Sequence, residues 1–167
     1  MKRIIIHWTA GGPVPNQHEK ECYHYLIDNI GKIYAGKFKP LANEICKAGM
    51  YAPHTGGGNT GSVGVALCGM WGYKNRQNLG AYPITKIQFE TAMQLCANLA
   101  TTYNIPINPT GVMTHYEFGK SHPKTSSAGK IDINFLPPYS WVEADDVGNF
   151  IRSKIKWYQQ NKKAQEI

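Results

Sequence analysis

Two histidines and an aspartate have the side-chain types that a catalytic zinc ion requires. His7 ends a short apolar run near the N-terminus, whereas His115 and Asp132 lie in residues 114–132, a segment punctuated by glycine, serine and proline. Two imidazoles and a carboxylate leave the fourth tetrahedral position of zinc to water, whose pKa falls to about 7 on binding. The three residues are remote in sequence and no short metal motif joins them, so a packed core histidine stays open as the alternative for His7.

A short strand at residues 2–8 (KRIIIHW) is predicted to carry His7, because this run is rich in β-branched residues. Alternation along a strand separates His7 from the face shared by three apolar residues, Ile4, Ile6 and Trp8. Further strands are predicted at residues 22–28 and 32–36, which form a hairpin around a turn at 29–31, and at 62–69 and 111–114.

Two capping boxes predict where the helices begin. The stretches 85–88 (TKIQ) and 140–143 (SWVE) both have the form S/T-x-x-E/Q, and apolar residues at helical spacing follow each of them. The order of elements therefore predicts one domain of the α/β (α+β) class, with a central mixed β-sheet flanked by helices. Residues 161–167 are expected to form a polar C-terminal tail.

Residues 54–69 (HTGGGNTGSVGVALCG) place a glycine-rich loop before a buried strand. Consecutive glycines can cradle a phosphate, but this stretch lacks the GK[ST] ending of a P-loop and leads into a strand rather than a helix. We therefore reject a nucleotide site here. Close approach of another ligand to the backbone stays open, because glycine leaves room for it.

The composition is that of a globular chain with a surplus of positive charge. Its 167 residues include 18 Lys and Arg against 11 Asp and Glu, a net charge of +7. This surplus favours polyanionic partners, whether nucleic acid, anionic lipid or an acidic polymer such as bacterial cell wall. No apolar run approaches the roughly 18 residues of a membrane span, and the run that ends at His7 is too short for a secretory signal. The four scattered cysteines predict buried free thiols in a reducing compartment.

Five sequence blocks follow one another along the chain: HWTA at His7, YHYLID at Tyr23 with the KIYAGK behind it, HTGGGNTGSVGVALCG at His54, THYEF around His115, and GKID at Lys130. In this order and context they resemble the zinc-dependent N-acetylmuramoyl-L-alanine amidases, above all the lysozyme-like amidases of tailed phages and the related peptidoglycan recognition proteins. The resemblance covers the chain from Arg3 to the last helix. It implies the fold of that family and hydrolysis of the bond between N-acetylmuramic acid and L-alanine in peptidoglycan.

The same resemblance implies that His7, His115 and Asp132 ligate one catalytic zinc ion, with Asp132 at a position where some relatives have cysteine. Lys130 matches the lysine two positions before the third ligand. Residues two apart in an extended segment point the same way, so Lys130 would face the zinc and stabilise the oxyanion that develops at the amide carbonyl.

Three further residues match positions near the zinc or in the substrate groove of the family. Tyr23 matches a tyrosine close to the metal-bound water and would orient or deprotonate that water. His54 and Asn59 match groove positions, which implies contact with substrate.

The chain also departs from the family pattern. The stretch between His7 and Tyr23 is short, which predicts a truncated first helix. The loop between His115 and Asp132 is long, which leaves His122 as an alternative third ligand. Among the remaining polar residues, His18 is expected on a surface loop, His24 in the packing of a strand, and Glu117 outside the site.

Residues 1–160 are therefore predicted to be a zinc amidase catalytic domain that acts as a monomer on peptidoglycan, without nucleic acid or membrane partners. With no signal peptide, we expect a phage or prophage endolysin that is made in the cytoplasm and reaches the wall through a holin or lysis. One rival is a non-catalytic zinc-containing peptidoglycan-binding protein. The other is a basic nucleic-acid binder using Arg152, Lys154 and Lys156, around which no recognised motif lies.

Overall fold

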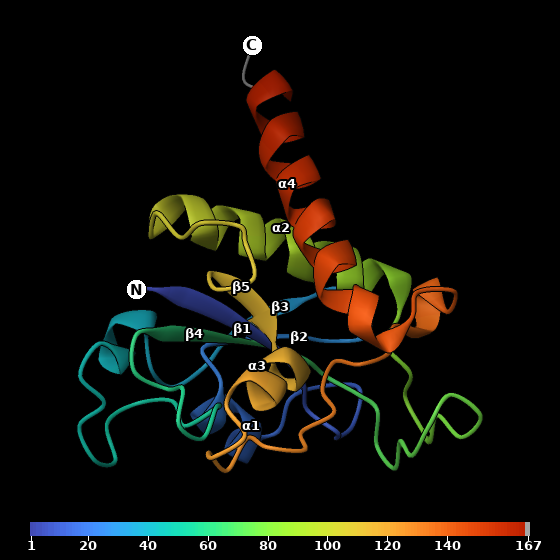
Figure 1. The fold of residues 1–167 in the computed structure, drawn as a ribbon, viewed down its shortest axis with the longest axis horizontal. Coiled ribbons are helices and arrows are strands. Elements are labelled where there is room, and N and C mark those ends of the chain that lie inside the picture. Colours follow the sequence, from blue (N-terminus) through green and yellow to red (C-terminus); the bar gives the residue numbers. More distant parts are fainter. Residues whose placement is uncertain (166–167) are drawn as a thin grey trace.

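A mixed five-stranded sheet forms the centre of the computed structural model, which describes residues 1–165 (Figure 1). The strands lie in the order β3-β2-β4-β1-β5. The central strand β4 pairs in parallel with β2 on one side and with β1 on the other, and β1 pairs in parallel with β5. Within this sheet, the β2–β3 hairpin is the antiparallel pair. The strands are β1 (Arg3–Trp8), β2 (Tyr25–Ile27), β3 (Ile33–Ala35), β4 (Ser62–Leu67) and β5 (Val112–Thr114). The predicted mixed sheet is confirmed.

Helices cover both faces of this sheet. The two long helices, α2 (Lys86–Thr102) and α4 (Val147–Gln165), pack together on one face, and the two short helices, α1 (Gln17–Cys22) and α3 (His115–Ser121), lie on the other (Figure 1). Most buried apolar residues fill the space between the sheet and the long helices. Helix α1 has six residues, in keeping with the short stretch between His7 and Tyr23.

Strand β1 sorts its side chains between these two layers as alternation predicts. Ile4, Ile6 and Trp8 belong to the large core under α2 and α4. Ile5 packs on the opposite side, with Met113 and Phe118 of the β5–α3 region. His7 therefore emerges, fully buried, from a central strand on the face that carries the short helices.

The capping box at Thr85 is confirmed as the start of α2, and it also joins that helix to the sheet. Thr85 and Gln88 exchange the two side-chain to backbone hydrogen bonds of the motif. The buried Gln88 amide donates in addition to the carbonyl oxygens of Ile27 and Cys68, at the ends of two adjacent strands. The Ile27 carbonyl also accepts the Cys68 N–H at 2.9 Å, so Gln88 adds a second hydrogen bond there and supplies one to the Cys68 carbonyl just beyond the end of β4.

The second predicted capping box, at residues 140–143, is wrong. The helix begins only at Val147, behind a 3₁₀ turn at Ala144–Asp146. Arg76 donates to the carbonyl oxygens of Ser140 and Val142, which holds this segment in an irregular conformation against another loop. At its far end α4 continues to Gln165, into the stretch expected as a polar tail, and residues 166–167 lie outside the described part of the chain.

Candidate metal centre

His7, His115 and Asp132 meet at one point. His7 Nδ1 lies 2.9 Å and His115 Nδ1 3.1 Å from Asp132 Oδ2, and the two Nδ1 atoms are 3.1 Å apart. A tetrahedral zinc ion with bonds of about 2.0–2.1 Å separates its ligand atoms by about 3.3 Å. These three residues can therefore hold a metal ion with little adjustment.

His115 reaches this point because a helix begins there. Thr114, the last residue of β5, caps α3: its hydroxyl accepts the Glu117 N–H, and the Glu117 carboxylate accepts the Thr114 N–H. The Tyr116 N–H also donates to the Asp132 carbonyl, 2.6 Å away, and so fixes the returning loop against the start of α3. Residues 114–121 are thus partly helical rather than a continuous loop, and the capping-box pattern THYE at 114–117 was the sequence signal for it.

The interior position sets the charge of the cluster. Burial lowers the pKa of His7 more than the hydrogen bond and charge of Asp132 raise it, so the imidazole is neutral near pH 7 and offers a lone pair. Burial raises the pKa of Asp132, but contacts with the two imidazoles outweigh it and leave the pKa below its usual value. A neutral imidazole and an ionised carboxylate are the forms in which these side chains bind metal.

The nitrogens that face away from the cluster have partners of their own. His7 Nε2 lies 3.1 Å from His54 Nδ1 and 3.3 Å from Thr55 Oγ1. His115 Nε2 lies 2.9 Å from Ser127 Oγ, which donates to the Gly56 carbonyl at 2.7 Å. Such contacts orient ligand imidazoles.

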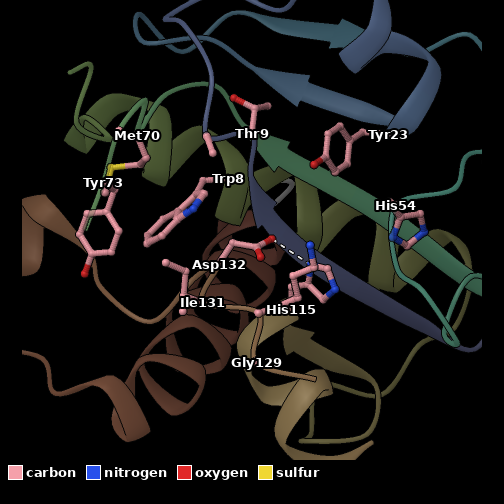
Figure 2. A pocket seen from close by; sticks show the side chains of 13 residues that line it. Trp8, Thr9, Tyr23, His54, Met70, Tyr73, His115, Gly129, Ile131 and Asp132 are labelled. Carbon is pink, nitrogen blue, oxygen red and sulfur yellow. Dashed lines mark hydrogen bonds and ion pairs between the residues drawn. The ribbon is translucent and has the colours of Figure 1, made fainter. Parts of the chain in front are cut away.

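A cavity of about 420 Å³ opens beside the cluster, and His115 and Asp132 are among the residues that line it. Figure 2 shows Tyr23 and His54 on one side of these two residues and Trp8 and Tyr73 on the other. The Tyr23 ring centre is 5.1 Å from that of His7. Burial and then the charge of Asp132 raise the pKa of Tyr23 above its usual value, so its hydroxyl keeps its proton.

The other predicted site residues take different positions. Lys130 is exposed and lines the cavity, as does the buried His54. Asn59 is not among the lining residues, and its side-chain oxygen accepts the Thr55 N–H at 2.8 Å. The roles of Tyr23, Lys130, His54 and Asn59 stay predictions.

The remaining histidines lie outside the metal cluster, together with Glu117. His122 stacks on Phe118 with ring centres 4.0 Å apart and is not part of the cluster, so it does not replace Asp132. His24 is buried and bonded to Asn43, as expected of a packed residue, and its pKa is lowered to about 4, mainly by burial. His18 is exposed but lies on α1 rather than on a loop.

Comparison with known proteins decides the family. The family model described as N-acetylmuramoyl-L-alanine amidase matches residues 1–130, more than three quarters of the sequence. The chain belongs to this amidase family. Asp132 lies two residues beyond the matched region, and the geometry of the cluster brings it together with the two histidines inside that region.

Solved structures of other proteins share the fold of this chain. The amidase LysC from Clostridium intestinale URNW matches with a TM-score of 0.56 at 19% identity, over 93% of this chain and 85% of that one. A mutant structure of PlyL matches with a TM-score of 0.54 at 21% identity, over 93% and 84%. The amidase AmiD from E. coli, in complex with its substrate, matches with a TM-score of 0.52 at 16% identity, over 92% and 57%. No curated protein sequence matches the chain.

Two further features of this amidase family member bear on its partners. Within residues 1–165, no helix is long and apolar enough to cross a membrane. Arg152 and Lys154, two of the three cations considered for nucleic-acid binding, pair instead with Glu117 and Glu90. Two of the three α4 cations considered for nucleic-acid binding therefore form ion pairs within the protein.

Proposed function

We propose that the protein is a zinc-dependent N-acetylmuramoyl-L-alanine amidase that hydrolyses the amide between the lactyl group of N-acetylmuramic acid and L-alanine in peptidoglycan. The observation that carries this proposal is the convergence of His7, His115 and Asp132 at a cavity, in a chain of this family. The substrate in the AmiD complex is anhydro-N-acetylmuramic acid-L-Ala-D-γ-Glu-L-Lys, which supports a muropeptide as the substrate here.

Zinc held by the three residues would act as a Lewis acid toward the amide carbonyl and lower the pKa of water to about 7. Two residues of the cavity would then act on the reacting groups. The Tyr23 hydroxyl, whose pKa burial raises in the metal-free protein, would orient the attacking water by hydrogen bonding. The Lys130 ammonium, which belongs to the lining of the same cavity as Asp132, stabilises the oxyanion that develops on the carbonyl.

The main alternative is a peptidoglycan-binding protein without catalysis. A zinc-containing binding protein would keep the three metal-binding residues but needs no tyrosine and lysine at the same cavity, so the presence of Tyr23 and Lys130 there favours hydrolysis. The endolysin role, release to the wall and a monomeric state stay predictions from the sequence.

Digestion of purified peptidoglycan tests the reaction. Zinc-loaded protein should generate new L-alanine amino termini but no new sugar reducing ends, and a chelated sample should generate neither. New reducing ends would indicate a glycosidase instead. Retention of zinc and polymer without any product would favour the binding protein.

A further inference from the structure

The glycine-rich loop at residues 54–58 contacts both histidines of the metal cluster on the side away from Asp132. His7 contacts His54 and Thr55 through Nε2, and His115 reaches the Gly56 carbonyl through Ser127. These contacts involve the ring nitrogens that do not face Asp132. The loop therefore stands where it can control the orientation of both imidazoles.

The hydrogen bonds of His54 determine which nitrogen of His7 carries the proton. His54 Nε2 lies 3.3 Å from the Ser62 carbonyl oxygen, which can only accept, so this nitrogen donates. In a neutral imidazole the other nitrogen, Nδ1, is then an acceptor. His54 Nδ1 has one lone pair and lies 2.7 Å from Thr55 Oγ1 and 3.1 Å from His7 Nε2, and Thr55 Oγ1 lies 3.3 Å from His7 Nε2. The His7 Nε2–H donates either to His54 Nδ1 directly or to the Thr55 hydroxyl that donates to His54 Nδ1. In both arrangements His7 Nδ1 presents its lone pair toward Asp132.

The same logic applies to His115 through a serine. Ser127 Oγ donates its proton to the Gly56 carbonyl, so it accepts from His115 Nε2. His115 Nδ1 then also presents a lone pair toward Asp132. With both tautomers set in this way, two nitrogen lone pairs and a carboxylate oxygen point at one position, which suits a cation.

Glycine residues make this approach of the loop possible. A Cβ at Gly58 would lie 2.5 Å from the Phe118 ring of α3, and a Cβ at Gly64 in β4 would lie 2.5 Å from the His54 ring. Side chains at these positions would push the loop away from α3 or tilt the His54 ring. The glycine residues, which do not form a nucleotide site, thus allow close packing of the loop against α3 and of β4 against the His54 ring.

We propose that the loop at residues 54–58 positions both ligand imidazoles, with His54 setting the tautomer of His7 and the Gly56 carbonyl setting that of His115 through Ser127. His54 is thus a positioning residue, in place of the substrate contact that its sequence position implies. Such a neutral histidine differs from the carboxylate, backbone carbonyl or water that usually accepts the second N–H of a ligand histidine. The inference rests on the proposed metal site, but not on the proposed reaction.

Zinc affinity of the full chain, measured by competition with a chromophoric chelator, tests this proposal without any wall substrate. Three variants are compared with wild type: His54→Phe removes the Nδ1 acceptor shared by His7 Nε2 and the Thr55 hydroxyl, His54→Asn keeps an oxygen acceptor near the position of Nδ1, and Ser127→Ala removes the serine relay. His122→Asn is the matched control, because His122 lies outside the cluster. The visible spectrum of the Co²⁺-substituted protein reports the coordination geometry of each variant.

We expect His54→Phe and Ser127→Ala to bind zinc about 10 to 100 times more weakly, with an altered Co²⁺ spectrum. His54→Asn should stay close to wild type, and so should His122→Asn. Wild-type affinity and spectrum in both His54→Phe and Ser127→Ala would overturn the proposal, as would equal losses in His54→Asn and His54→Phe. If His54→Phe does not fold, unchanged affinity in Ser127→Ala overturns it.

The zinc-affinity measurements are independent of the test of the proposed reaction. If zinc affinities follow the expected pattern while peptidoglycan yields no L-alanine termini, the amidase function fails and the positioning role of the loop stands.

Discussion

Arg152 ties the last helix to the strand and helix that carry His115, and its replacement by methionine should destabilise the protein strongly. The guanidinium is buried and donates to the Val112 carbonyl and to both carboxylate oxygens of Glu117, at 2.9 to 3.0 Å. Glu117 is the residue that completes the cap of α3. Gly148 leaves the space for this ion pair, since a Cβ there would lie 1.9 Å from Glu117 Oε1.

The exposure of the two side chains sets the size of the effect. Removing one partner of a buried ion pair costs about 3–5 kcal/mol, because the other charge is left without a partner. The Arg152 side chain is 7% exposed but that of Glu117 is 28% exposed, so water can partly solvate the stranded carboxylate. We therefore expect a loss near the lower limit, about 3 kcal/mol. At about 2–4 °C per kcal/mol for a domain of this size, the melting midpoint should fall by roughly 6–12 °C.

Urea denaturation of the metal-free protein measures this loss directly. Lys156→Met, an exposed site on the same helix, is the control and should change little. The double variant Arg152→Met/Glu117→Gln should recover much of the loss, because no charge remains unpaired. A loss below about 1 kcal/mol for Arg152→Met, typical of an exposed ion pair, would refute this reasoning.

Three further predictions concern charge, thiols and metal. Burial opposes the ionisation of Glu90, but hydrogen bonds from Lys154, Tyr139 and Tyr158 outweigh it and lower its pKa below 4.5. A carboxyl group whose pKa is lower in the folded state than in the unfolded state stabilises the fold at pH values above its unfolded pKa. The difference in unfolding free energy between wild type and Glu90→Gln should therefore shrink as the pH falls below about 4.5. A difference that does not change with pH would contradict this. A thiol reagent should label the partly exposed Cys22 and Cys46 in the folded protein, and Cys68 and Cys96 only on unfolding, since burial raises their pKa to about 12. Asp132→Ala should lose tightly bound zinc in elemental analysis whereas Asp132→Cys keeps it, because thiolate is an equally suitable ligand; wild-type zinc content in Asp132→Ala would exclude Asp132 as a ligand.

The elements with strong local patterns could be predicted from the sequence. Alternation in β1 separates His7 from Ile4, Ile6 and Trp8, and the capping box at Thr85 marks the start of α2. Both signals depend on residues within a few positions of each other. The expectation of four buried thiols was only half correct, because Cys22 and Cys46 lie on short segments near the surface.

Local patterns fail where distant contacts decide the conformation. The same capping motif is used at Thr114 but not at Ser140, and the difference is tertiary: Arg76 holds the carbonyls of the 140–143 segment, whereas the Tyr116 N–H bonds the Asp132 carbonyl. The meeting of His7, His115 and Asp132 at one point could be expected only from family resemblance. The contacts of His54 and Ser127 with His7 and His115 could not be predicted, because they depend on loop packing and ring orientation.

Hydrolysis of a purified muropeptide in ¹⁸O-labelled water tests the central claim most directly. If the zinc-loaded protein is an N-acetylmuramoyl-L-alanine amidase, mass spectrometry should find one ¹⁸O atom in the lactyl carboxylate of the muramic acid product and none in the released peptide, which begins with a free L-alanine. Label at another peptide bond, or an intact muropeptide after incubation with fully loaded protein, would contradict it.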